Sequence, residues 1–341
     1  MSAQRKDDGL MPGGPKSMPR GHISGTSAAT AAVQWPKPLP LISCVIPCYN
    51  HGHFVSKAID SVLAQTYPHH EIIVVDDGST DLTSEVVARY GDVRYVRQRN
   101  QGLPAARNRG IHESRGQYLV FLDADDLLLP EHFVLSLNAF RSHPQAGWVC
   151  GNFLFLGSDP TWRHVHRCER WHDDYATLLR MNFIAAVHTV MFSRHAIMAV
   201  GGFNERRRAN EDHDLYLRLA RHFPLHCHHQ TIAEYRRNGQ QMSQQWEIML
   251  KFATQTYHSQ WEHVRGHAVY EAAYRQGLSQ LRGHYGEKAV WQMVNYLRSG
   301  DWKRAMQVVR VLIRWYPEGL FHLMRGKVSR VLFRFGKPHA S

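Results

Sequence analysis

The chain has 341 residues, of which 43% are hydrophobic and 21% charged, so it can build a buried core and wholesale disorder is excluded. Its formal net charge of +12 favours anionic partners such as nucleotides, phospholipid headgroups or nucleic acid. No apolar run is long enough to cross a bilayer or to act as a secretory signal, and five scattered cysteines predict no disulfide scaffold and indicate a reducing compartment.

The first part of the chain divides into a leader and an alternating region. Residues 1–40 are rich in Gly, Pro, Ser and Ala without periodicity, and we predict that they are disordered. Short apolar runs then alternate with segments of helical periodicity. Strands are predicted over residues 41–50, 71–79, 93–98, 117–126 and 147–157, and helices over 53–66, 81–91, 102–114 and 129–144. This alternation predicts an α/β fold with a mainly parallel, Rossmann-like sheet and helices on both faces.

The second part of the chain is less regular and then becomes helical. Over residues 155–240 we expect short strands, a helix near 173–181, a turn at 201–202 and a helix over 212–223. From about Gln245 the pattern is helical, with two helices joined at residues 299–301. We therefore predict a catalytic or binding domain over residues 41–243 and a basic, amphipathic helical appendage over residues 244–341.

Polar clusters follow three of the predicted strands. They occupy residues 47–50, 76–78 and 123–126. Because ligands bind outside the carboxyl ends of parallel strands, these clusters are expected to converge on one edge of the sheet.

Each cluster has a functional and a purely structural interpretation. Asp123 and Asp125 share a face of an extended chain and suit a divalent cation, but Asp125 or Asp126 could instead cap the next helix. The carboxylates of residues 76–77 could accept hydrogen bonds from a base or a ribose, or form a turn with a helix cap. Arg107 near a helix start favours an anion site, with an ordinary basic surface helix as the alternative.

Two further groups of residues have alternative interpretations. Glu211 and Asp212 open a predicted helix, where one carboxylate could be a general base or could simply stabilise the helix N-terminus. Clusters of His and Cys at residues 164–172 and 226–229 invite a zinc site, but there is no CxxC pair, so exposed histidines are the preferred interpretation.

Five motifs in order resemble the family 2 glycosyltransferases, an inverting group with a GT-A fold, over about residues 41–243. The motifs are VIPCYNHGHFVSKAIDSVLAQTY, EIIVVDDGSTD, RQRNQGLPAARNRGI, GQYLVFLDADD, and GGFNE followed by EDHDLYLRLA and EYRRNGQQMS. One such motif alone is weak, whereas the ordered set is specific.

The resemblance implies a nucleotide-diphospho-sugar donor, with a UDP-sugar as the first expectation. The implied donor-binding residues are Pro47, Tyr49, Asn50, Asp76, Asp77, Gly102, Arg107, Asp123, Arg236 and Arg237. Asp125, with Asp123, would hold Mn²⁺ or Mg²⁺, which neutralises the departing diphosphate. Asp212, with Glu211 beside it, would be the general base in a single displacement that inverts the anomeric carbon.

The sequence departs from the family pattern at one position. It also does not identify the acceptor molecule. Family members often carry a His shortly after YR, where this chain has Asn238, so Arg237 is a hypothetical substitute. A QxxRW motif is absent, which favours single addition over processive synthesis. The expected acceptor is a glycan or a lipid-linked molecule in polysaccharide or glycolipid assembly at the cell envelope.

Two other functions are less well supported by the sequence. A sugar nucleotidyltransferase also uses an α/β sheet and a metal held by carboxylates, but CYNHGHF is a poor version of its Gly-rich loop. A nucleic-acid-binding protein is favoured only by the charge, and no nucleic-acid-binding motif supports it.

The last forty residues lie outside the resemblance. Residues 301–341 hold nine Lys and Arg against two acidic residues, interleaved with large apolar side chains. This composition suits an interfacial helix on anionic lipid or, equally, a helical cap on the catalytic domain. We expect a cytoplasmic protein, and peripheral attachment to the inner face of the membrane stays open.

Overall fold

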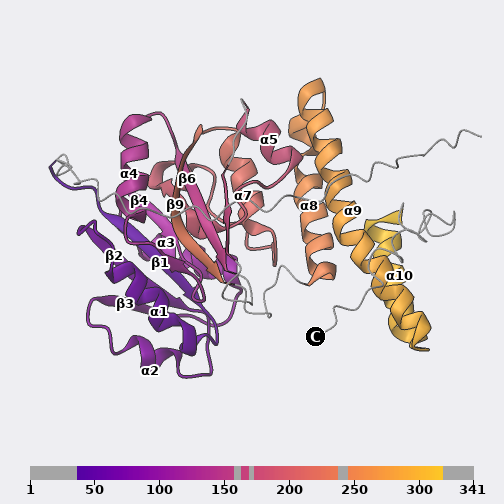
Figure 1. Ribbon diagram of the computed structural model, residues 1–341, viewed down its shortest axis with the longest axis horizontal. Helices are drawn as coiled ribbons and strands as arrows, with labels where there is room; N and C mark the ends of the chain where they lie inside the picture. Colours follow the sequence, from indigo (N-terminus) through magenta and orange to yellow (C-terminus); the bar gives the residue numbers. More distant parts are fainter. Residues whose placement is uncertain (1–36, 157–162, 169–172, 237–244, 318–341) are drawn as a thin grey trace, which may run out of the picture. The chain divides into compact units, whose positions relative to one another are not determined.

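The computed structural model describes residues 37–156, 163–168, 173–236 and 245–317 (Figure 1). The predicted leader up to residue 36 lies outside the described residues, as do Arg237, Asn238 and the tail beyond residue 317. The described elements belong to the unit of the chain that begins at Pro40. Within them, no helix combines the length and the apolar character that crossing a membrane requires.

The described strands form one nine-stranded sheet with the order β3-β2-β1-β4-β8-β6-β9-β5, and β7 pairs with β6 beside this path. The strands are β1 (Ile42–Cys48), β2 (His70–Asp76), β3 (Val93–Arg97), β4 (Tyr118–Phe121), β5 (Leu127–Leu128), β6 (Trp148–Leu156), β7 (Arg163–His166), β8 (Val190–Ser193) and β9 (Leu225–Arg236). Pairing is parallel among β3, β2, β1 and β4, as the sequence predicts. Because β8 runs antiparallel to both β4 and β6, the whole sheet is mixed.

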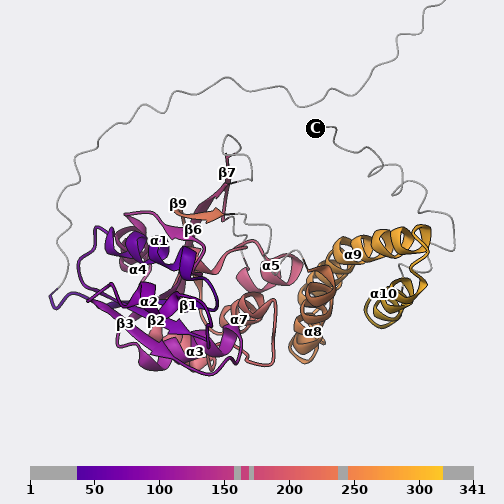
Figure 2. The same cartoon turned by 90° about the horizontal axis from the view of Figure 1, so that it is seen from below.

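The helices cover both faces of this sheet. They are α1 (Gly52–Leu63), α2 (Thr83–Val87), α3 (Leu103–Glu113), α4 (His132–Ser142), α5 (Asp174–Arg180), α6 (Arg194–Ala199), α7 (Glu211–Ala220), α8 (Trp246–Val264), α9 (Ala268–Arg298) and α10 (Trp302–Trp315), with a 3-10 turn η1 (Val187–Thr189). Figure 2 shows α1 and α4 on one side of the strands and α3 and α7 on the other. The predicted α/β class with C-terminal helices is thus confirmed.

The main core lies between the sheet and the layer that contains α3, α5 and α7. It joins Val45 and Phe121 of the sheet to Ile111 of α3 and Leu215 of α7. The strands are buried because helices cover both faces, which explains their continuous apolar sequences. This packing holds the ends of β1, β2 and β4 in fixed positions next to the first turn of α7.

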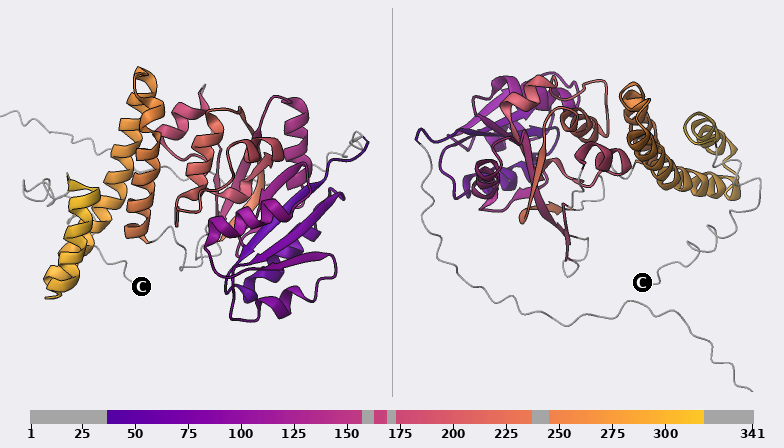
Figure 3. Two further views of the ribbon diagram at one scale, coloured as in Figure 1. Left: turned by 180° about the vertical axis from the view of Figure 1, so that it is seen from behind. Right: turned by 90° about the horizontal axis from the view of Figure 1, so that it is seen from above.

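Helix α10 packs on α9 and still exposes apolar residues (Figure 3). Leu312 and Val308 are buried against α9 residues that include Val290, so α10 packs within the C-terminal helical region. The predicted cap on the catalytic domain stays a prediction. Trp302 is 67% exposed and Ile313 is 60% exposed. Membrane attachment through this region stays a prediction, since most of the basic tail lies outside the described residues.

One pair of cysteines is bonded, which the absence of a disulfide pattern in the sequence does not predict. A disulfide joins Cys150 of β6 to Cys168, which follows β7. The pairing of β7 with β6 brings these two residues together, and a tertiary contact of this kind cannot be read from the spacing of cysteines along the chain.

Gly110 provides a test of how tightly α3 packs on β1. A Cβ atom at this position would lie 2.1 Å from Cγ1 of Val45. We expect Gly110→Ala to lower the free energy of unfolding by about 1–3 kcal/mol through overpacking, despite the better helix propensity of Ala. Gly283→Ala in α9 is the control, because a Cβ there meets nothing within 4 Å. Denaturant unfolding of both variants measures the effect, and equal stabilities would contradict the close packing.

Candidate functional site

A pocket of about 1130 Å³ opens at the carboxyl ends of β1, β2 and β4. The predicted site residues that line it are Pro47, Tyr49, Asp77, Gly102, Arg107, Asp123, Asp125, Glu211 and Asp212. The three polar clusters and the start of α7 therefore converge, as the strand-end argument predicts. Arg236 ends β9, and Arg237 lies outside the described residues.

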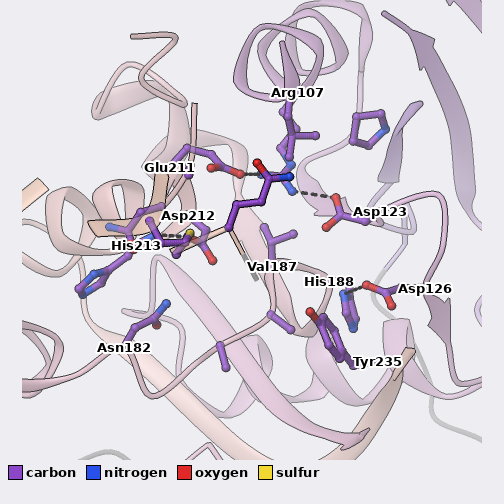
Figure 4. A pocket seen from close by; sticks show the side chains of 18 of the residues that line it. Arg107, Asp123, Asp126, Asn182, Val187, His188, Glu211, Asp212, His213 and Tyr235 are labelled. Atoms are coloured by element: carbon purple, nitrogen blue, oxygen red, sulfur yellow. Dashed lines mark hydrogen bonds and ion pairs between the residues drawn. The ribbon is translucent and has the colours of Figure 1, made fainter. Parts of the chain in front are cut away.

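Arg107 connects the two halves of the pocket. Its guanidinium is 2% exposed and donates to Oε1 of Glu211 at 2.6 Å and to Oδ1 of Asp123 at 2.7 Å. Figure 4 shows it reaching down from α3 between these two carboxylates. The guanidinium also lies over the ring of Phe203, 5.2 Å from the ring centre. One buried cation thus fixes the start of α7 relative to the end of β4.

Burial and nearby charge shift the pKa values of Arg107, Glu211 and Asp212. Burial opposes the charge of Arg107, but the carboxylates of Asp123 and Glu211 outweigh it and raise the pKa of the guanidinium. Burial raises the pKa of Glu211, although Arg107 opposes the rise. Burial also raises the pKa of Asp212, and the nearby charge of Asp123 acts in the same direction.

Asp77 holds the loop that follows β3. Its Oδ1 accepts from the side chain of Gln98 at 2.8 Å and from the backbone N–H of Gln101 at 2.9 Å, and its Oδ2 accepts from the N–H of Gly102 at 2.8 Å. Gly102 has φ of 94°, a left-handed conformation that Gly adopts without strain, and it lines the pocket just before α3. The carboxylate that the sequence assigns to the donor therefore also shapes the loop around it.

Asp76 and Asn50 do not line this pocket. Side chains alternate along a strand, so Asp76 points away from Asp77 and accepts from Tyr95 and from the N–H of Ser79. Asn50 accepts from the N–H of Thr80 at 2.8 Å, which ties the loops after β1 and β2 together. A donor contact by either residue stays a prediction.

The acidic loop after β4 contributes a pair that sequence reasoning did not assign to the site. Asp126 is buried, and its Oδ2 lies 3.1 Å from Nδ1 of His188 in η1. Burial lowers the pKa of His188, but the charge of Asp126 outweighs this and raises it. Figure 4 shows His188 beside Tyr235 of β9 at one end of the pocket. The acidic run itself was the only signal in the sequence for this pair.

A second wall of the pocket comes from the C-terminal helices. Gln280, His284 and Tyr285 of α9 line it, together with Tyr257 of α8. Burial raises the pKa of Tyr285, and the charge of Asp212 adds to the rise. No motif in the sequence marks these residues, because a helical pattern does not show which face meets a distant pocket.

Part of the chain is similar in sequence to known proteins. Residues 43–206 match the model of "Glycosyl transferase family 2". An uncharacterized glycosyltransferase of Rickettsia typhi is 31% identical over 58% of this chain and 64% of its own length. A chondroitin synthase of Escherichia coli is 31% identical over 54% of this chain and 27% of its own length. The chain thus matches less than two thirds of the length of either curated relative.

The solved structure of mannosyltransferase PcManGT from Pyrobaculum calidifontis, in complex with GDP-Man and Mn²⁺, has a similar fold. The TM-score is 0.52 at 16% identity, covering 82% of this chain and 87% of the other. This likeness concerns the fold, which is of the GT-A type. The family match and the relatives thus show that residues 43–206 are similar to family 2 glycosyltransferases.

Arg107 allows a direct test of the buried ion pairs. We expect Arg107→Ala to lower the free energy of unfolding by about 3–5 kcal/mol, because it leaves buried carboxylate charge without its partner. Arg109→Ala is the matched control on the same helix. Arg109 is 51% exposed and pairs with Glu113, so its loss should cost less than about 1 kcal/mol. Thermal or denaturant unfolding compares the two, and similar losses would contradict the role given to Arg107.

Proposed function

We propose that the protein is an inverting glycosyltransferase that moves a sugar from a nucleotide-diphospho-sugar to an acceptor hydroxyl. One observation carries the proposal: Asp123 and Asp125 at the end of a parallel strand share one pocket with Asp212 at the start of α7. This arrangement offers a carboxylate pair for a metal ion and a separate carboxylate for a proton. A single displacement of the nucleoside diphosphate by a hydroxyl can use both.

The balance of charge in the pocket supports a divalent cation. Six carboxyl groups line it, from Asp77, Asp123, Asp125, Asp126, Glu211 and Asp212. Arg107 is already engaged by Glu211 and Asp123. An anionic diphosphate entering this pocket would be repelled unless a cation compensates the carboxylates.

Asp123 and Asp125 fit such an ion, because carboxylate oxygens suit Mn²⁺ and Mg²⁺. Both line the pocket, and the side chain of Asp123 is 33% exposed, so a ligand can reach it. When bound, the ion supplies Lewis-acid compensation for the charge that develops on the leaving diphosphate. That PcManGT was solved with Mn²⁺ is consistent with this assignment.

Asp212, rather than Glu211, is proposed as the general base. Glu211 is occupied by Arg107 at 2.6 Å. The hydrogen bonds found among the described residues engage only Oδ1 of Asp212, which accepts from the N–H of His213 at 2.7 Å. Its second oxygen is therefore available to take the proton of an acceptor hydroxyl as that oxygen attacks the sugar.

The acceptor is proposed to approach along the wall formed by α8 and α9, because Tyr257, Gln280 and His284 face the pocket there. A ring face and polar side chains of this kind suit a sugar. The relative named chondroitin synthase supports a polysaccharide acceptor. A UDP-sugar remains the first donor to try, with GDP-sugars second because of PcManGT.

The pH dependence of transfer tests Asp212. A base works only when deprotonated, and burial raises the pKa of Asp212 above its ordinary value of 3.8. We therefore expect kcat/KM to fall as the pH drops through this raised pKa, with an acid limb at higher pH than an ordinary Asp carboxyl group gives. Asp212→Asn should lower the rate by at least about 100-fold at all pH values.

Glu211→Gln is the comparison variant, since it keeps Asp212 and weakens only the contact with Arg107. It should retain an acid limb. A full loss of rate in Glu211→Gln with a normal rate in Asp212→Asn would reverse the assignment of the base.

Thermal stability with UDP or GDP nucleotides and Mn²⁺ tests the donor site. A nucleotide at about 100 times its dissociation constant should add about 2.7 kcal/mol to stability. We expect this shift to require Mn²⁺, to disappear in Asp125→Ala and to persist in Asp212→Asn. If the nucleotide still raises the thermal stability of Asp125→Ala in the absence of metal, Asp125 is not a ligand of the proposed metal ion.

A further inference from the structure

Three cysteines from distant parts of the chain meet in the core. Cys150 lies in β6, Cys168 follows β7 and Cys227 lies in β9, and each is at most 3% exposed. Their sulfur atoms all lie within 4.8 Å of one another. The Sγ atom of Cys227 is 3.3 Å from that of Cys150 and 2.9 Å from that of Cys168. The other two cysteines, Cys44 and Cys48, are buried without joining this group.

The sheet is irregular where the sulfurs meet. Cys150 pairs with Cys227, but the next paired residues are Asn152 and Thr231, so β9 has two more residues than β6 between these pairs. His229, within this bulge, has φ of 56°, a left-handed conformation that is uncommon outside Gly. Bulges of this kind occur where a strand must re-aim side chains, often beside functional sites.

The side chain of Asn152 connects Cys168 to the bulge in β9 through two hydrogen bonds. Its Oδ1 accepts from the backbone N–H of Cys168 at 2.8 Å, and its Nδ2 donates to the carbonyl of His229 at 2.6 Å. Asn152 is 5% exposed and directly connects the segment after β7 to β9. A buried amide that holds a ligand-bearing segment in this way is typical of the outer shell of a metal site.

A disulfide accounts for only two of these three sulfurs. Exchange of the Cys150–Cys168 bond with Cys227 would need the three atoms nearly in a line, because the attacking sulfur enters opposite the leaving one. Cys227 instead lies close to both of the others, so the three sulfurs form a closed triangle. Three thiolates around one ion also form a triangle, and tetrahedral zinc places its sulfur ligands about 3.8 Å apart, so all three sulfurs would move apart on binding.

We propose that Cys150, Cys168 and Cys227 of the reduced protein form a thiolate site for a thiophilic metal ion, zinc first among them. Each thiol loses one proton on binding, and the Cys150–Cys168 disulfide is absent from the metal-bound form. Soft thiolates select zinc, whereas the carboxylates of Asp123 and Asp125 select Mn²⁺ or Mg²⁺, so this site is distinct from the proposed donor metal.

The ion would act as a structural clamp on one side of the pocket. Cys168 lies between β7 and α5, and the chain after α5 lines the pocket through Met181, Asn182 and His188. His166, two residues before Cys168, already contacts the carbonyl of Phe183 in that segment at 3.0 Å. A metal ion that joins Cys168 to Cys150 of β6 and Cys227 of β9 would fix the position at which the chain leaves β7 on its way to α5.

The test measures metal content and needs no transferase activity. The full chain is purified without oxygen in a phosphine reductant, loaded with Zn²⁺ and examined by native mass spectrometry. We expect one tightly bound zinc per chain in the wild type. Cys150→Ser, Cys168→Ser and Cys227→Ser should each weaken zinc binding by at least about 100-fold, and Asn152→Ala by about 10–100-fold.

Two control variants test whether zinc binding is specific to the three cysteines. Cys44→Ser also places a hydroxyl at a buried cysteine and should keep the zinc. Asp125→Ala should keep it as well, so failure of the proposed donor site and failure of this site give different results.

Cobalt provides a second measurement that does not depend on whether the serine variants fold. Co²⁺ bound to thiolates in the wild type should give a sulfur-to-metal charge-transfer absorption in the near ultraviolet, which carboxylate-bound cobalt lacks. The proposal is overturned if the reduced wild type binds no zinc, if its cobalt form lacks that absorption, if Cys227→Ser keeps the zinc, or if the Cys150–Cys168 disulfide persists in the presence of reductant and zinc.

Discussion

The buried guanidinium of Arg107 is the interaction on which the rest of the site depends. It binds a carboxylate at the end of β4 and another in the first turn of α7, two elements that are far apart in the sequence. Such a pair is costly to desolvate and is retained only with close geometry on both sides. Here the geometry places Asp212, the neighbour of Glu211, opposite Asp123 and Asp125 across one pocket.

Contacts within the protein already engage some of the carboxylates in the pocket. Those held by the protein serve the fold, as Glu211 does through Arg107 and Asp77 does through the loop that begins α3. Asp123 is bound by Arg107 and also lines the pocket, so it belongs to the fold and to the proposed metal site. Part of the negative charge in the pocket is thus neutralised by Arg107, and the proposed cation would compensate more of it. The acidic pocket and the basic overall charge of the chain are therefore compatible.

The sequence predicts the local features of this structure well and the long-range ones poorly. Apolar runs that end in Pro47, Asp77 and Asp123 identify strands whose ends meet, because parallel βαβ units place those ends together. Tertiary packing determines the long-range features. These are the antiparallel pairing of β8, the wall formed by α8 and α9, and the contact between His188 and Asp126. The convergence of Cys150, Cys168 and Cys227 also depends on tertiary packing. It cannot be predicted from the sequence, because no short spacing such as CxxC marks it.

Backbone conformation explains why the two carboxylates of α7 can be side by side. Asn210 has φ of 60° immediately before the helix, and Asn tolerates this left-handed geometry better than most residues. The turn presents Glu211 and Asp212 in the first turn of α7, where the helix dipole favours negative charge. His213 then anchors the turn through its Nε2 contact with the carbonyl of Leu178 at 2.9 Å, and burial lowers the pKa of His213 to about 4, so this imidazole is neutral at physiological pH. With one neighbour bound to Arg107 and the other anchored to α5, the backbone holds Asp212 in place, which suits the role of general base proposed for it.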